Sequence, residues 1–140
     1  MSRENHCSSK RSRSDMKLDN ALDNAISAHA KWKYRLMEAI DTGRSPWRVG
    51  DVRTDHECEF GKWLIALPLS ERLSEHAKQV RVLHAEFHTL AAAVLELALA
   101  GRREEATAAM ALGSRFAVVS SNLTVTIMAW KEAASGASLE

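Results

Sequence analysis

His84 and His88 lie four residues apart in a segment with helical periodicity. On a helix, this spacing places both imidazole rings on one face, one turn apart, so both can reach a single metal ion. The neighbouring positions Val80, Phe87 and Ala91 are apolar, whereas a solvated histidine pair more often lies among charged residues. The spacing alone also arises by chance, but these surroundings make the pair a candidate for half of a metal site.

Two further residues extend this candidate site. His29 lies on the apolar seam of an earlier helical segment, and Cys58 lies between the two segments. Each has a simpler explanation, because a buried histidine can be a hydrogen-bonded core residue and a free cysteine often behaves as a small apolar side chain. Together, however, three imidazoles and one thiolate match the ligand types and number of a closed tetrahedral zinc site. We therefore predict that His29, Cys58, His84 and His88 bind Zn²⁺.

Two other histidines test this assignment. His76 precedes His84 by eight residues, which is about 12 Å along a helix axis at ~1.5 Å per residue, so the two cannot share a metal ion. His56 is close enough to Cys58 in the chain to be a substitute ligand. Its neighbours are acidic, and we expect it to face solvent instead.

The apolar pattern predicts the elements that position these residues. Apolar residues recur at steps of three and four over residues 18–39, which predicts a long helix with His29 on its seam. Glycines and a proline then indicate a loop over residues 41–54. A short helix over about residues 55–66 would carry Cys58, before a proline ends it.

Two more long helices follow in the sequence. Ser70 is a suitable N-terminal cap for a helix that continues to Gly101, and a last helix is predicted from about Arg102 to Trp130. Helices of this length with short connections pack as antiparallel bundles. We therefore predict an all-α fold, an antiparallel four-helix-type bundle with three long helices and one short helix that carries the cysteine ligand.

Length and composition set the domain organisation. A chain of 140 residues with 46% hydrophobic content can bury one core. We expect a disordered polar tail at residues 1–14, one bundle domain at residues 15–134 and a frayed end at residues 135–140. Cys7 and Cys58 do not make a disulfide framework, which favours a reducing compartment.

The charge balance excludes several classes of partner. The 19 basic residues are matched by 18 acidic ones, so no overall field favours nucleic acid or an anionic membrane. No apolar run approaches the roughly 20 residues that cross a bilayer, and no secretory signal segment is recognisable. We expect a cytoplasmic protein without membrane insertion.

Three segments carry motifs in a defined order: residues 29–33 are HAKWK, residues 58–64 are CEFGKWL and residues 84–88 are HAEFH. These resemble the HxxWK, CxxGxWL and HxxxH elements of the chemoreceptor zinc-binding (CZB) domain family of bacterial signalling proteins. The resemblance spans residues 18–92, and the last helix is similar to the family in pattern only. It implies that the zinc ligands are His29, Cys58, His84 and His88.

The other motif residues can also be given structural roles. Gly61 would allow a close backbone approach near the metal, and Trp32 and Trp63 would supply apolar walls that restrict water. The two tryptophans are also compatible with simple packing in the bundle core.

Four protein ligands leave no open metal position for a substrate or an activated water, so we do not expect an enzyme. The resemblance implies a sensory domain that responds to zinc and to hypochlorous acid. A zinc-bound thiolate at Cys58 would also be the most oxidisable group in the domain. The alternative is a purely structural zinc in a protein-interaction module. The sequence lacks the set of inward-facing carboxylates that a di-iron bundle requires. The seam position of His29 argues against a phosphotransfer histidine.

Partners follow from the length of the apolar seams and from the resemblance. The seams of the last two predicted helices are longer than a short partner helix can cover, so we expect a homodimer. The chain carries no chemoreceptor signalling hairpin and no diguanylate cyclase motif. Either output passes through a bacterial signalling protein of one of these types, acting in trans, or this is an isolated module.

Overall fold

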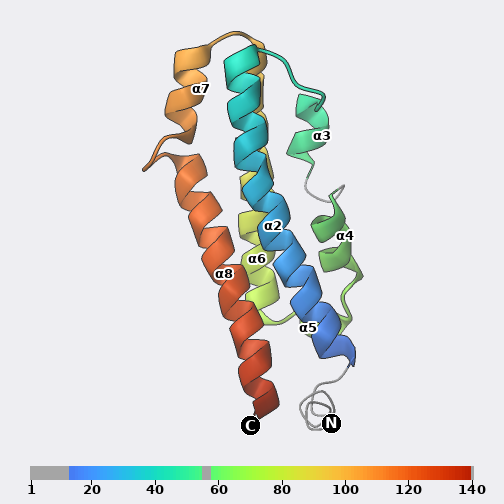
Figure 1. Ribbon diagram of the computed structural model, residues 1–140. Helices are drawn as coiled ribbons and strands as arrows, with labels where there is room; N and C mark the ends of the chain where they lie inside the picture. The colour runs from blue at the N-terminus through green and yellow to red at the C-terminus, as the bar shows by residue number, and fades with distance from the viewer. Residues whose placement is uncertain (1–12, 55–57, 140) are drawn as a thin grey trace, which may run out of the picture.

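The structure of the protein is a computed structural model that describes residues 13–54 and 58–139. Within these ranges every regular element is an α-helix, which confirms the predicted all-α class (Figure 1). The helices are α2 (Arg13–Thr42), α3 (Val49–Arg53), α4 (Glu59–Ala66), α5 (Leu69–Arg72), α6 (Glu75–Leu99), α7 (Arg103–Met110) and α8 (Arg115–Leu139).

The helices form four columns that alternate in direction. In Figure 1, α2 and α6 run upwards, whereas α3 to α5 and then α7 and α8 return downwards. Helix α6 contacts both α2 and α8, and α3 and α4 also pack against it. The bundle is therefore antiparallel and of the four-helix type, with one column built from short helices.

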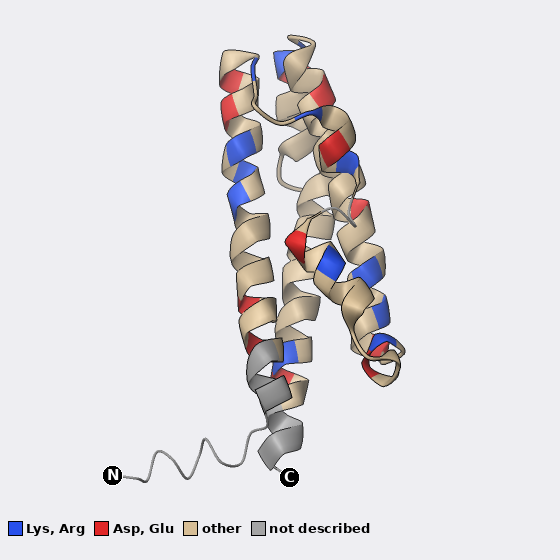
Figure 2. Ribbon diagram, turned by 90° about the vertical axis from the view of Figure 1, so that its right-hand side faces the viewer, with Lys and Arg blue, Asp and Glu red and all other residues tan. Residues whose placement is uncertain are grey.

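The core lies between the long helices and is made of aliphatic and aromatic side chains. The largest of its fully buried apolar residues are Phe87, Phe116, Leu22, Leu36, Leu64, Leu95, Leu123 and Ile127. Basic and acidic residues are both distributed along the helices of the bundle (Figure 2). The periodicity that the sequence shows thus corresponds to the buried faces of α2, α6 and α8.

Helix α6 is both long and apolar. Among the residues that the structure describes, it is the one helix whose length and hydropathy would suffice to cross a membrane. Its position in this bundle accounts for that composition, because it contacts α2, α3, α4, α7 and α8. A helix surrounded by other helices is apolar on several faces.

Helix α6 begins one turn later than the sequence indicates. Its N-cap is Ser74, whose hydroxyl accepts a hydrogen bond from the Ala77 N–H at 3.2 Å. The prediction of Ser70 as the cap is wrong, because Leu69–Arg72 form the separate turn α5. Both serines precede a glutamate, so the local capping signal is the same at the two positions.

The last predicted helix is broken into α7 and α8. Gly113 adopts φ +87° in the connection, a conformation that interrupts a right-handed helix and that glycine tolerates best. The apolar rhythm continues across the break, because Ala106 and Phe116 are both buried. Periodicity therefore indicated one helix where the backbone forms two.

Residues 1–12 and the side chains of residues 135–140 lie outside the described part of the chain. Helix α2 starts at Arg13, and the backbone of α8 stays helical to Leu139. The disordered tail at residues 1–14, the domain limits 15–134 and the frayed end at residues 135–140 stay predictions.

Candidate metal centre

The structure brings together the four residues that the sequence singled out. The candidate ligand atoms of His29, Cys58, His84 and His88 all lie within 4.8 Å of one another. His29 comes from α2, the two other histidines come from α6, and Cys58 is the N-cap residue of α4. Three helices thus converge on one cluster.

The separations in the cluster suit one tetrahedral metal ion. The Cys58 Sγ lies 3.3 Å from the His84 Nε2, and the Nε2 atoms of His84 and His88 lie 3.1 Å apart. Tetrahedral Zn²⁺, with bonds of about 2.0 Å to nitrogen and about 2.3 Å to sulfur, separates its ligand atoms by about 3.3–3.6 Å. The donor set and its spacing therefore fit zinc.

Backbone carbonyls orient two of the imidazole rings. The Nδ1–H of His29 donates to the Ala25 carbonyl oxygen at 2.7 Å, and the Nδ1–H of His88 donates to the Val52 carbonyl oxygen at 2.8 Å. A carbonyl oxygen can only accept, so each neutral ring keeps its lone pair on Nε2. This is the arrangement in which a histidine presents Nε2 to a metal.

Burial keeps the imidazoles of His29 and His84 neutral. His29 is 7% exposed and His84 is fully buried. Burial, opposed by the hydrogen bond to Ala25 and assisted by the nearby His88, lowers the pKa of His29 to about 4. Burial is also the main cause that lowers the pKa of His84, and the charges of His29 and His88 are smaller lowering causes. At neutral pH both rings are therefore in the form that binds a metal.

Cys58 sits at the start of α4, where the helix dipole is positive. Its Sγ accepts a hydrogen bond from the Gly61 N–H at 3.3 Å. A helix N-terminus and a backbone donor both favour a negatively charged sulfur. The buried Gly61 thus contributes a hydrogen bond to the cluster, a role that sequence reasoning did not assign to it.

Two phenylalanines cover the imidazole cluster. The Phe60 ring lies 5.8 Å from the ring of His29 and 5.2 Å from that of His84, centroid to centroid. The Phe87 ring lies 5.0 Å from that of His29. Sequence reasoning did not assign this role to Phe87, which lies between the two histidines of α6, whereas Phe60 lies inside the CEFGKWL motif.

The two tryptophans predicted as walls contact other aromatic rings. Trp63 stacks on Phe60 with ring centroids 5.6 Å apart, on the outer side of the cluster. Trp32 lies 5.1 Å from Trp47, a residue of the connection between α2 and α3. Their predicted effect on water at the metal stays a prediction.

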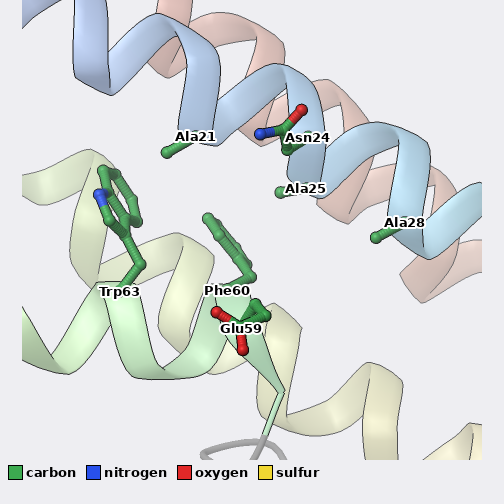
Figure 3. Close-up of a pocket in the computed structure, with 7 residues that line it drawn as sticks. All are labelled: Ala21, Asn24, Ala25, Ala28, Glu59, Phe60 and Trp63. Atoms are coloured by element: carbon green, nitrogen blue, oxygen red, sulfur yellow. The ribbon is translucent and has the colours of Figure 1, made fainter.

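A cleft lies beside the cluster, between α2 and α4 (Figure 3). It has a volume of about 390 Å³ and is lined by Ala21, Asn24, Ala25, Ala28, Glu59, Phe60 and Trp63. The Phe60 ring points from α4 toward α2 in this view. Because the same ring contacts His29 and His84, it lies between the cleft and the cluster.

Of the histidines outside the cluster, the structure describes His76. His76 lies on α6 two turns before His84, and it is not part of the cluster. That it does not share a metal ion with His84 stays a prediction. His56, the substitute ligand that we considered, lies outside the described residues.

Comparison with known families agrees with this geometry. Residues 29–95 match the family model of the chemoreceptor zinc-binding domain. The matched residues identify a CZB domain in this part of the chain. The matched region of this CZB domain contains all four residues of the cluster and ends within α6. Searches among curated proteins and among solved structures found no match.

Proposed function

We propose that this CZB domain binds one Zn²⁺ ion through His29, Cys58, His84 and His88 and serves as a sensory or regulatory domain in bacterial signalling. The supporting observation is the convergence of three imidazoles and one sulfur, from three helices, within 4.8 Å. Backbone carbonyls already orient the rings of His29 and His88 so that Nε2 is the nitrogen available to a cation, which limits the rearrangement that binding requires.

The role that we propose is not catalytic. When bound, zinc would supply a link between three helices and would hold the cysteine as a thiolate. With four protein ligands, no coordination position remains for a substrate or a water molecule. His29 would transmit the occupancy of the site to α2, Cys58 to α4, and the two remaining ligands to α6.

We further propose that the site responds to oxidants such as hypochlorous acid through Cys58. The thiolate is the reactive form of cysteine, and oxidation would weaken one of the bonds that join α4 to the bundle. Helix α4 has only eight residues, and its buried side chains are few. The loss of that bond would therefore act first on the position of α4.

Metal analysis tests the zinc assignment. Protein purified without chelator is expected to contain about one zinc per chain, and Cys58→Ala is expected to lose most of it because one of four ligands is removed. His76→Ala is the matched control and should keep the zinc of the wild type. A zinc content near zero in the wild type would refute the proposal.

A purely structural zinc is the second candidate, because a closed set of four ligands is also typical of structural sites. Zinc affinity separates the two functions. A sensor should load and release zinc over the cellular range of free zinc, whereas a structural site should remain filled throughout it.

We also propose that the domain is a cytoplasmic homodimer whose output passes to a chemoreceptor-type or diguanylate cyclase-type protein in trans. Support for self-association comes from α8, where Val118, Val125 and Met128 are 43%, 61% and 55% exposed. These residues recur at helical spacing, which suits packing against another helix.

Light scattering at micromolar concentration is expected to give twice the chain mass of 15.5 kDa. Val125→Glu should shift the protein toward the monomer, because a charge would be buried in the helix pair. Val82→Glu changes an equally exposed valine of α6, 67% accessible, and should leave the mass unchanged. A monomeric wild type with zinc bound would count against this part of the proposal.

A further inference from the structure

The carbonyl that orients His88 belongs to a helix too short to be stable alone. Helix α3 has five residues, and no side chain caps its N-terminus. Isolated helices of this length do not form in water. Its Val52 nevertheless supplies the acceptor for the His88 Nδ1–H at 2.8 Å. Contacts with the rest of the protein must therefore hold α3 in place.

One side of α3 packs on α6, with Val52 3% exposed. The ion pair between Arg53 and Glu96 adds little, because its closest atoms are 3.7 Å apart and both side chains are more than half exposed. The packing against α6 therefore holds the buried side of α3, and the segment before the helix needs a support of its own.

That support is an aromatic clamp, which we define as Trp32 and Arg35 of α2 together with Trp47. Trp47 lies two residues before α3, in the connection that descends from the end of α2 (Figure 1). Its ring centroid lies 5.1 Å from that of Trp32. The Arg35 Cζ lies 4.6 Å from the Trp47 ring centroid and 4.9 Å from that of Trp32. Both distances are within the range of cation–π attraction.

The aromatic clamp connects two parts of the candidate metal centre. Trp32 is buried and lies three residues after His29 on α2. Trp47 leads directly into α3, which supplies the acceptor for His88. The clamp thus ties the start of α3 to the same helix that carries His29.

We propose that Trp47 and Arg35 are positioning residues for His88: they hold α3, and through the Val52 carbonyl they keep the Nε2 atom of His88 directed at the metal. This inference rests on the proposed zinc binding. Arg35 packs on the rings of Trp32 and Trp47, and Trp47 leads into α3, so their effect passes through α3 and the hydrogen bond to His88. Loss of such an outer hydrogen-bond partner typically lowers metal affinity 10–100-fold.

The first test is zinc affinity, measured by competition with a chromogenic chelator. Trp47→Ala is expected to lower the affinity about tenfold. Trp47→Phe keeps an aromatic face for Arg35 and should stay within about threefold of the wild type. Arg35→Ala leaves both tryptophans in place and should lower the affinity in the same direction. Tyr34→Ala changes a neighbouring α2 residue that is 72% exposed and should have no effect.

A double-mutant cycle with His88→Ala separates positioning from a general loss of structure. If the clamp acts through His88, Trp47→Ala should cause no further loss of zinc affinity once His88 is absent. A tenfold loss that persists in the His88→Ala protein would overturn the inference, as would a Trp47→Ala protein with the affinity of the wild type. In both cases zinc binding by the wild type still supports the proposed function. A wild type that binds no zinc refutes the proposed function and the inference about the clamp together.

Discussion

Removal of zinc by a chelator is expected to lower the midpoint of thermal unfolding of this protein by about 12 °C. A ligand that binds only the folded state at about a thousand times its dissociation constant stabilises that state by about 4 kcal/mol. For a chain of this size each kcal/mol corresponds to about 3 °C. The effect should be large because the cluster joins α2, α4 and α6, and these helices are separated in the unfolded chain.

The control variants make this prediction specific to the cluster. His84→Ala removes a fully buried residue of the cluster, so its midpoint should be the same with and without chelator. His76→Ala should respond as the wild type does, because His76 is not part of the cluster. The prediction is wrong if wild-type protein that demonstrably contains zinc unfolds at one temperature under both conditions.

One equivalent of hypochlorous acid is expected to oxidise Cys58 before Cys7 and to release zinc. A zinc-bound cysteine is fully ionised, whereas an ordinary thiol with a pKa of about 8.5 is only about 3% ionised at pH 7. The thiolate attacks the chlorine and displaces hydroxide. Water then replaces chlorine on sulfur, which yields a sulfenic acid, chloride and a proton. The sulfenic acid is a weaker ligand than the thiolate.

Access to the sulfur explains the choice of oxidant. Cys58 is only partly buried, but Phe60 covers the neighbouring imidazoles and Trp63 stacks on Phe60. A small oxidant reaches such a sulfur more easily than a large one. Cys7 lies outside the described residues and serves as the internal comparison in the same chain.

Mass spectrometry should locate the added oxygen, while a chromogenic chelator follows zinc release in parallel. Cys7→Ser should leave both signals unchanged, since the reaction occurs at the other cysteine. If Cys7 is oxidised first while Cys58 and the zinc content stay intact, the redox part of the proposed function is wrong. Zinc sensing and a structural zinc would then remain as the two candidate functions.

The helical class and the buried faces of the long helices could be predicted from the sequence, because side-chain periodicity is a local property. The element boundaries could not. Ser70 and Ser74 carry the same capping signal, and the packing of the chain after Pro68 selects the second serine. Helix α3 had no signal of its own within the predicted loop, because a five-residue helix depends on contacts with distant residues.

The sequence by itself determined which four residues could bind zinc. The spacing of His84 and His88, the seam position of His29 and the type of the fourth ligand are all visible in the chain. Only the tertiary structure decided what surrounds them: Phe60 and Phe87 contact the imidazoles, and the Val52 carbonyl orients His88. Val52 and His88, and likewise His29 and Phe87, lie far apart in the chain. Such contacts depend on how helices pack, and no local periodicity encodes that packing.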